Sequence, residues 1–259
     1  MTPPKKSLGQ NWLNSPSAIK KIVEAGNVTN TDTVLEVGPG KGALTEALLA
    51  TGAKVVAIEK DHRLLEELSI TFKTEIKSNQ LILLEEDILQ ISATTLKALV
   101  GPSYKVIANI PYYITGELIR FFLSHTLQPT QMVILVQKEV AERIVSRDKK
   151  ESILSLSVKA YGTPKFIGKV PAGAFIPAPK VDSAILCISN INRNQFTNVT
   201  EDQFFAIVKQ GFAQKRKLLR GNLNLSKETL LLCNINPDTR AEDVPIDKWF
   251  CLTKIHHVS

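Results

Sequence analysis

The stretch TVLEVGPGKGALTEALLATGAKVVAIEKD, Thr33 to Asp61, is the strongest indication of the fold. Its ends, TVLEV and KVVAIEKD, are short β-branched runs typical of strands, and GALTEALLAT between them has the i, i+3, i+4 apolar spacing of a helix. A glycine-rich turn separates the first strand from the helix. Strand, helix and strand in this order indicate parallel strands covered by helices.

The same alternation continues to about Asn190. Further strand runs are LILLEED, YKVIAN and MVILVQ, and the helical segments between them include RLLEELSITF, GELIRFFLSH and EVAERIVS. The run SAILCISNI has no helix-length segment before it, so we expect it to close the sheet as an antiparallel strand. The pattern predicts an α/β fold with a mostly parallel sheet.

The character of the chain changes after NINRNQFTNV, because no strand run follows it. Thr200 stands three residues ahead of Gln203, which is the spacing of a helix capping box. We therefore expect a catalytic domain over residues 1–192 and a small helical domain over residues 193–259.

The chain of 259 residues has a formal net charge of +7. This balance favours a polyanionic partner, with nucleic acid ahead of the alternative of a basic protein that binds none. The amino terminus contains no apolar signal segment, and no run approaches the ~18 apolar residues that a membrane span needs. We expect a soluble, cytoplasmic protein without membrane contact.

Cysteine and histidine spacing indicates neither a disulfide nor a metal site. The three cysteines are odd in number, far apart and flanked by apolar residues, so we predict buried thiols in a reducing compartment: Cys187, Cys233 and Cys251. The four histidines show no ligand spacing with the cysteines or with one another: His62, His125, His256 and His257. We predict no metal ion.

The glycines Gly38, Gly40 and Gly42 follow the first strand. They let the backbone approach a ligand, and they leave the next helix with its N-terminus facing that ligand. Taken alone, such a loop is a weak signal, since it also occurs for structural reasons and here lacks the third glycine of the dinucleotide spacing.

Acidic residues end the next two strands. Glu59 stands twenty-one residues after Gly38, where a carboxylate can accept both hydrogen bonds of a ribose diol. Asp87 ends the third strand, where it can accept from the amino group of an adenine whose face Ile88 covers. The alternative for both is an exposed loop acid, and we expect Asp61 only to cap a helix. With the glycine loop, the two acids indicate a nucleoside-binding crevice.

The fourth strand ends in VIANIPYY. The side-chain oxygen of Asn109 and the carbonyl of Ile110, next to the rigid Pro111, are candidates to hold the two hydrogens of an adenine amino group. Such contacts would free a nitrogen lone pair that is otherwise delocalised into the ring. Tyr112 is placed to stack on the base. A structural turn explains the same residues equally well when they are considered alone, and Tyr113 has no assigned role.

Eight segments occur in the order and at about the separations of a known family: SLGQNWL, LEVGPGKGALT, IEKD, EEDIL, NIPYYIT, QKEVAERI, FIPAPKVDSA and FAQKRKLLRGNL. Nearly the whole chain resembles the ribosomal RNA adenine dimethyltransferases, and most closely their bacterial small-subunit branch. NIPY together with FIPAPKVDS is specific, and the glycine loop is much less so. The resemblance implies a Rossmann-like class I fold that uses S-adenosylmethionine, with a small helical C-terminal domain.

The resemblance also implies roles for individual residues. The methyl donor is expected to contact Asn11, Leu13, Gly38, Gly40, Glu59, Asp87 and Asn109, with Gln10 beside them. The target base is expected to lie against Asn109, Ile110, Tyr112 and Phe175. The place of the Phe175 ring on the second face of the base follows from the resemblance alone.

Two departures from the family pattern stand out. Trp12 replaces the commoner Phe in QNFL, which we interpret as the exchange of one large ring for another. Ile153 and Leu154 replace a Tyr-Gly pair ahead of SLSV, which affects the expected conformation of the preceding loop.

Basic residues gather in KQGFAQKRKLLRGNL within what we expect to be two helical turns: Lys215, Arg216, Lys217 and Arg220. Such a run is usually a solvated face, but the net charge and the family pattern favour phosphate contacts. A second candidate patch consists of Arg143, Arg147, Lys149 and Lys150.

The resemblance implies dimethylation of the N6 amino groups of two adjacent adenosines near the 3′ end of small-subunit (16S) ribosomal RNA. We expect a monomer that acts on this RNA within a small subunit or its precursor. The alternatives are a large-subunit methylase of the antibiotic-resistance type, a non-catalytic ribosome-assembly protein and a small-molecule methyltransferase.

Overall fold

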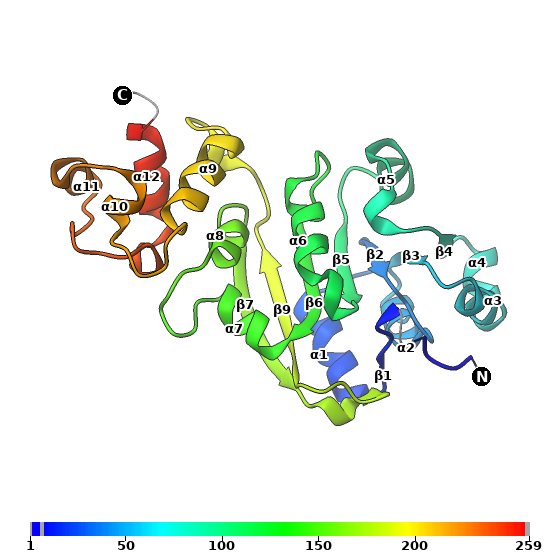
Figure 1. Ribbon diagram of the computed structural model, residues 1–259. Coiled ribbons are helices and arrows are strands. Elements are labelled where there is room, and N and C mark those ends of the chain that lie inside the picture. Colours follow the sequence, from blue (N-terminus) through cyan, green and yellow to red (C-terminus); the bar gives the residue numbers. More distant parts are fainter. Residues whose placement is uncertain (1, 6–7, 257–259) are drawn as a thin grey trace. The chain divides into compact units, whose positions relative to one another are not determined.

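The computed structural model describes residues 2–5 and 8–256 and separates into two compact units (Figure 1). The first unit comprises the chain up to Ala141 together with Lys165–Ile191, and the second comprises Glu142–Pro164 together with the chain from Asn192 onward. The sequence pattern placed residues 142–164 with the sheet. In the structure Tyr161 instead donates a hydrogen bond to Glu201 of the second unit.

A seven-stranded sheet forms the centre of the first unit, in the order β4-β3-β2-β5-β6-β9-β7. Its strands are β2 (Thr33–Val37), β3 (Lys54–Glu59), β4 (Leu81–Glu85), β5 (Lys105–Asn109), β6 (Gln131–Gln137), β7 (Thr163–Val170) and β9 (Ser183–Ser189). The pairs β2–β3, β3–β4, β2–β5 and β5–β6 are parallel, and β6–β9 is antiparallel. The mostly parallel sheet and the antiparallel direction of β9 are therefore confirmed. Strand β9 does not close the sheet, however, because it lies between β6 and β7, and β7 is the strand at that edge.

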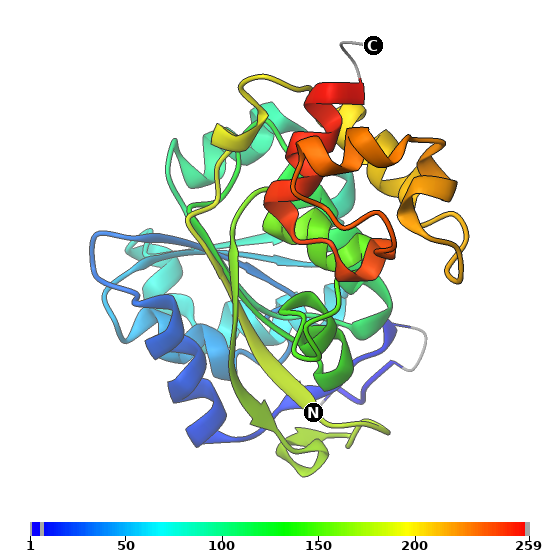
Figure 2. The ribbon, with the colours of Figure 1, turned by 90° about the vertical axis from the view of Figure 1, so that its left-hand side faces the viewer.

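Helices cover both faces of this sheet, which explains its continuous apolar strand runs. The helices are α1 (Pro16–Gly26), α2 (Ala43–Leu49), α3 (His62–Thr71), α4 (Lys73–Lys77), α5 (Ala93–Val100) and α6 (Thr115–Ser124). The boundary between the two units falls within α7 (Lys138–Ile144), after Ala141. Figures 1 and 2 show α1 and α2 on one face and α5 and α6 on the other. The five central residues of β6 are consequently all buried.

A separate two-stranded sheet joins the amino-terminal segment to the FIPAP motif. Strand β1 (Trp12–Leu13) pairs antiparallel with β8 (Phe175–Ile176), with Trp12 opposite Ile176 and Leu13 opposite Phe175. The backbone N–H of Asn14 extends this pairing by donating to the carbonyl of Ala174 at 2.7 Å. This pairing fixes the residues just before Trp12 at the edge of the larger sheet where β2, β3 and β5 end.

The second unit is helical, with α8 (Ile153–Lys159), α9 (Glu201–Gly211), α10 (Leu219–Leu223), α11 (Lys227–Leu232) and α12 (Ile246–His256). Thr200 and Gln203 form the expected capping box at the start of α9. The rings of Phe204 and Phe250 stack with centroids 4.3 Å apart and join α9 to α12. Ile153 and Leu154, which depart from the family pattern, form the first turn of α8. No helix in the described ranges of the chain has the length and apolar character needed to cross a membrane.

The prediction of three free thiols is wrong for two of the cysteines. Cys233 and Cys251 form a disulfide, whereas Cys187 is free and buried, as expected. Cys233 follows α11 and Cys251 lies in α12, so the packing of two helices brings together residues that are 18 positions apart. The prediction used only the positions of the cysteines along the sequence, which do not show that these two helices pack together.

The disulfide should stabilise the second unit. A bond that closes a loop of this size contributes about 3 kcal/mol by restricting the unfolded chain. We expect dithiothreitol to lower the unfolding free energy of the wild type by about 2–3 kcal/mol in urea titrations. The control is the double variant Cys233→Ser/Cys251→Ser, which should match the reduced wild type and not respond to dithiothreitol. Equal wild-type stability with and without dithiothreitol would contradict the linkage.

Candidate active site

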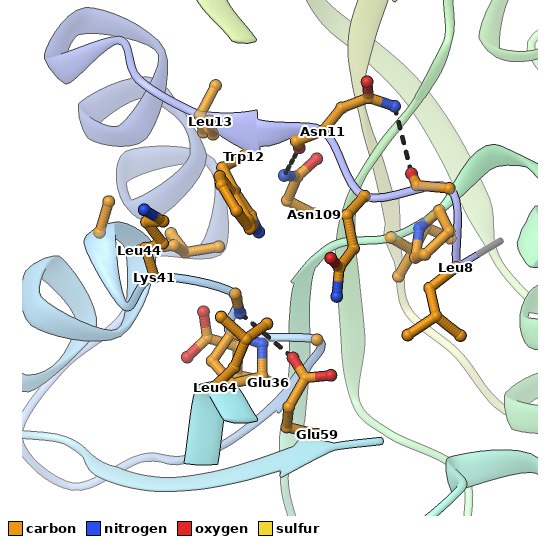
Figure 3. Close-up of a pocket in the computed structure, with 18 of the residues that line it drawn as sticks. Leu8, Asn11, Trp12, Leu13, Glu36, Lys41, Leu44, Glu59, Leu64 and Asn109 are labelled. Atoms are coloured by element: carbon orange, nitrogen blue, oxygen red, sulfur yellow. Dashed lines mark hydrogen bonds between the residues drawn. The ribbon is translucent and has the colours of Figure 1, made fainter. Parts of the chain in front are cut away.

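The pocket of interest lies in the first unit, where β2, β3 and β5 end and the amino-terminal segment runs across them (Figure 3). Eight residues expected from the sequence to form the site line it: Asn11, Leu13, Gly38, Gly40, Glu59, Asn109, Ile110 and Tyr112. Among the described residues, Asp87 and Phe175 lie outside this lining. The strand ends and the amino-terminal segment together bring residues up to 101 positions apart in sequence into one pocket, from Asn11 to Tyr112.

The glycine loop has the backbone conformation that its sequence suggested. Gly38 has φ +69° and donates its N–H to the carbonyl of Ile58 at 2.9 Å, which fixes the loop to β3. Gly40 has φ +60°, and a Cβ atom there would lie 2.9 Å from Cδ1 of Trp12. Both positions favour glycine, the first for its conformation and the second also for the close approach of the ring.

Glu59 is held in one orientation by backbone donors. Its Oε1 accepts from the N–H groups of Lys60 and Asp61, each at 2.9 Å, and its Oε2 accepts from Gly40 at 3.4 Å. Burial raises the pKa of Glu59, and these backbone donors oppose that shift. The Oε2 atom retains capacity for a further donor, as a ribose-binding carboxylate requires.

Glu36 also lines the pocket, although the sequence interpretation did not include it. It is 1% exposed and accepts a hydrogen bond from the Thr45 hydroxyl at 2.7 Å. Burial raises the pKa of Glu36 to about 8, and the neighbouring charge of Glu59 adds to the shift. The sequence signal was an acid inside the apolar run TVLEV, a position where a carboxyl is rarely buried without a role.

Asn109 at the end of β5 is oriented by the amino-terminal segment. Its Nδ2 donates to the backbone carbonyl of Asn11 at 3.1 Å (Figure 3). This bond engages the donor end of the amide and leaves Oδ1 as the acceptor that the side chain offers to the pocket. The expected hydrogen-bond acceptor for an amino group is therefore available.

Tyr112 lies in a 3₁₀ turn directly after Pro111. Its hydroxyl and that of Ser183 are 2.5 Å apart, and burial raises the pKa of Tyr112. Ser183 is fully buried at the start of β9, within the FIPAPKVDSA segment. One hydrogen bond thus connects the two most specific motifs, and the sequence interpretation missed Ser183 because its role depends on the antiparallel position of β9.

Asp87 follows β4 by two residues and caps the short 3₁₀ turn Ile88–Gln90. Its carboxylate accepts from the N–H of Leu89 at 3.1 Å and pairs with Lys60 Nζ at 2.7 Å. The Lys60 ammonium lowers the pKa of Asp87. An adenine amino group at this carboxylate would therefore share it with Lys60.

Phe175 is buried, whereas Tyr113 is exposed. Phe175 is 2% exposed and packs in the core opposite Leu13, away from the pocket surface. Tyr113 is 66% exposed, and its ring lies 3.1 Å from where a Cβ atom of Gly9 would be. Tyr113 therefore packs on the amino-terminal segment at the mouth of the site.

The family of the chain follows from its sequence matches. Residues 1–257 match the family described as ribosomal RNA adenine dimethylase. The chain belongs to this family. A protein from Dehalococcoides mccartyi strain CBDB1, named ribosomal RNA small subunit methyltransferase A, is 41% identical over 253 residues, which cover 95% of this chain and 86% of that protein.

Two solved structures resemble this dimethylase family member. A dimethyladenosine transferase from Plasmodium falciparum has a TM-score of 0.77 at 25% identity, covering 93% of this chain and 95% of that one. The 23S rRNA methyltransferase ErmE has a TM-score of 0.79 at 21% identity, and the match covers 94% of this chain and 98% of that one. The expected Rossmann-like class I methyltransferase fold is confirmed.

The dimethylase motif residue Gln10 links the amino-terminal segment to β3. Its Nε2 donates to Asp61 at 3.0 Å, and Arg63 binds the same carboxylate through two nitrogens at 3.0 and 2.8 Å. The Arg63 guanidinium holds the pKa of Asp61 well below its usual range. Asp61 occupies the N-cap position of α3, but within the described chain its side chain makes no capping bond. The expected N-cap position is therefore confirmed, but the side chain of Asp61 binds Gln10 and Arg63 in addition to this role.

The prediction that the basic residues from Lys215 to Arg220 lie in one continuous helix is wrong. Helix α9 ends at Gly211, α10 begins at Leu219, and Lys215, Arg216 and Lys217 are exposed on the loop between them. The Asn222 side chain holds this loop, since its Nδ2 donates to the carbonyls of Gly211 at 2.6 Å and Gln214 at 3.1 Å. These side-chain bonds replace the backbone bonds that would continue the helix.

Some of the other basic residues singled out in the sequence form ion pairs with acidic side chains. Arg220 lies in α10, with Nη2 4.0 Å from Asp238. In the second candidate patch Arg147 pairs with Glu142 at 2.6 Å, and Lys150 pairs with Glu242. All four residues of this second patch are nevertheless exposed, as are Lys215, Arg216 and Lys217 in the loop. Among residues 2–5 and 8–256 no cluster of three potential metal ligands occurs, and His257 lies outside these ranges.

The raised pKa of Glu36 should make the free energy of unfolding depend on pH. Between pH 4.5 and about 8 the folded state holds one proton more than the unfolded state, so this carboxyl makes stability fall as pH rises. We expect Glu36→Gln to be more stable than wild type by on the order of a few kcal/mol at pH 8, with a smaller difference at pH 5. Urea unfolding across this range measures the effect.

The control for this experiment is Glu46→Gln at an exposed position of α2, whose pH curve should run parallel to that of the wild type. A constant difference between Glu36→Gln and wild type from pH 5 to 8 would contradict a protonated Glu36.

Proposed function

We propose that this protein transfers methyl groups from S-adenosylmethionine to the N6 amino groups of two adjacent adenosines near the 3′ end of small-subunit ribosomal RNA. The observation that supports this most is the orientation of Asn109 by the Asn11 carbonyl in the same pocket as the fixed carboxylate of Glu59. The first group offers an acceptor to an amine, and the second offers one to a ribose. A nucleoside methyl donor and an amino acceptor can therefore meet there.

The pocket fits the nucleoside part of the donor. Glu59 Oε2 would accept from the ribose, and the backbone of Gly38 and Gly40 would approach the ligand closely. Asn11 and Leu13 would close the pocket from the amino-terminal segment, and Asp87 would accept from the adenine amino group beside Lys60. When bound, S-adenosylmethionine supplies a methyl group activated by its sulfonium centre.

The base-binding residues would act by positioning. The Asn109 Oδ1 atom and the Ile110 carbonyl would accept the two amino hydrogens, so that the nitrogen lone pair points away from the ring. An uncharged amide leaves the positive charge of the reacting methyl uncompensated, which keeps the methyl electrophilic. Tyr112, oriented by Ser183, would stack on the base. Holding both reactants in line provides most of the rate enhancement.

Phe175 is the least supported of the proposed residues. Its burial opposite Leu13 supports a packing role beneath β1, and its contact with the base remains a prediction from the family resemblance. Contact with a base would require the ring to leave the core.

We further propose that the substrate is ribosomal RNA within a small subunit or its precursor, bound by a monomer in the cytoplasm. The exposed loop of Lys215, Arg216 and Lys217 supports phosphate binding, with Arg220 at its end. The relative from D. mccartyi is named as a small-subunit methyltransferase, which favours this substrate over the large-subunit alternative. The hydrogen bonds that orient Glu59 and Asn109 argue against a non-catalytic role.

Locating the transferred methyl tests the proposed function and the role of Asn109 together. Wild-type protein, labelled S-adenosylmethionine and unmethylated small subunits should give label at two adjacent adenosines of the RNA. Asn109→Ala should lower the rate by at least about a hundredfold, because the amino group then has one acceptor fewer, while binding of RNA stays within about threefold.

Label on large-subunit RNA would exclude the proposed substrate. A wild-type rate for Asn109→Ala would exclude the role of Asn109 but not the substrate.

The basic loop should determine the salt dependence of RNA binding. We expect the triple variant Lys215→Gln/Arg216→Gln/Lys217→Gln to reduce the slope of log affinity against log salt by about 0.7–0.9 for each phosphate that the loop no longer neutralises. Filter binding of small-subunit RNA at several salt concentrations measures this slope. The control removes three exposed lysines elsewhere in the second unit, Lys209, Lys227 and Lys254, and an equal slope change in both variants would show only a general charge effect.

A further inference from the structure

Trp12 has a polar group that the described structure leaves without a partner. The residue belongs to β1 and lines the donor pocket, and its indole Nε1 is buried without a hydrogen-bond partner among the described residues. Figure 3 shows the Trp12 ring above the glycine loop, with its nitrogen directed into the pocket. A buried donor left unpaired costs free energy, which suggests that a ligand supplies the acceptor.

The surroundings of the ring include a glycine at its edge and a positive charge over its face. The edge of the ring lies on Gly40, where a Cβ atom would be 2.9 Å from Cδ1 and 3.4 Å from Nε1. Lys41 Nζ lies 4.4 Å from the centroid of the ring. The phenylalanine that is commoner in the family at this position has a ring but no N–H group. The indole of this chain therefore adds a hydrogen-bond donor to a ring whose face carries a cation.

The strand order indicates which part of the donor molecule reaches Trp12. The sheet runs β4-β3-β2, with Asp87 two residues after β4, Glu59 at the end of β3 and the glycine loop after β2. A nucleoside with its adenine at Asp87 and its ribose at Glu59 extends its remaining part toward the glycine loop. In S-adenosylmethionine that remaining part is the amino acid, whose carboxylate is the only anionic group of the molecule.

We propose that the Trp12 indole N–H, together with Lys41, binds the carboxylate of the amino-acid part of S-adenosylmethionine. This inference rests on the proposed function of the pocket. A ring that offers an N–H donor and carries an ammonium group over its face is suited to an anion, and hydrogen bonds to charged acceptors are stronger than those to neutral ones. The nearby Glu36 opposes an anion little at neutral pH, because burial raises its pKa to about 8 and keeps it largely protonated. Trp12 is thus a ligand-binding residue in its own right and not only a substitute for phenylalanine.

Two ligands separate the carboxylate contact from ring packing. S-adenosylhomocysteine contains the amino-acid part, and 5′-methylthioadenosine lacks it. We expect Trp12→Phe to lower the affinity for S-adenosylhomocysteine by about tenfold in calorimetry. The affinity for 5′-methylthioadenosine should stay within about twofold of the wild-type value. Lys41→Met should show the same selectivity, and Lys41→Arg should restore most of the affinity.

Trp249→Phe is the matched control. The Trp249 indole lies in the second unit, is fully buried and donates to the carbonyl of Val244 at 3.0 Å. Its replacement should lower the melting temperature of the free protein without changing either ligand affinity. Trp12→Phe should not lower the melting temperature in this way, because the donor that it removes is unpaired without ligand.

Equal losses for both ligands in Trp12→Phe, or no loss for S-adenosylhomocysteine, would overturn the carboxylate contact. A wild-type protein that binds neither ligand would overturn the proposed function itself, and this inference with it. If the wild type binds both ligands and Trp12→Phe loses affinity only for S-adenosylhomocysteine, the result supports the proposed function and the carboxylate contact.

Discussion

The parallel pairing of β2 with both β3 and β5 is the constraint on which the site depends. It brings the carboxyl ends of three strands to one edge of the sheet, and these ends supply the glycine loop, Glu59 and Asn109. Because β-strands in such a sheet are buried on both faces, the polar residues at their ends are among the few that can reach a ligand. The position of the pocket is therefore a consequence of topology, whereas its chemistry depends on a few side chains.

Hydrogen bonds from the backbone give those side chains a defined orientation. Glu59 accepts from three N–H groups, and Asn109 donates to the carbonyl of Asn11. The second bond couples the chemistry of β5 to the amino-terminal segment, which β8 holds through β1 and which Gln10 holds through Asp61. The amino-terminal segment is thus part of the site and not a peripheral extension. An amide in this setting is preorganised, which is how a group without charge contributes to a reaction.

Sequence patterns predicted the parts of the structure that depend on local spacing. Strand and helix periodicity indicated the α/β sheet, and strand-end residues indicated Gly38, Glu59 and Asn109. The patterns failed where non-local packing decides. The disulfide between Cys233 and Cys251 requires α11 and α12 to meet, the bond between Tyr112 and Ser183 requires β9 to lie beside β6, and the loop of Lys215 exists because Asn222 engages two carbonyls. Glu36 was missed because its burial depends on the whole sheet.

The exchange of phenylalanine for tryptophan at position 12 shows why ring size alone is a poor guide to a buried site. In volume the two rings are close substitutes, and the sequence favours a neutral exchange. The structure adds that the indole nitrogen is buried without a partner among the described residues, next to Gly40 and Lys41. An unsatisfied buried donor costs free energy while the pocket is empty, and an acceptor on a ligand removes that cost. The substitution is therefore explained better by what enters the pocket than by how the ring packs.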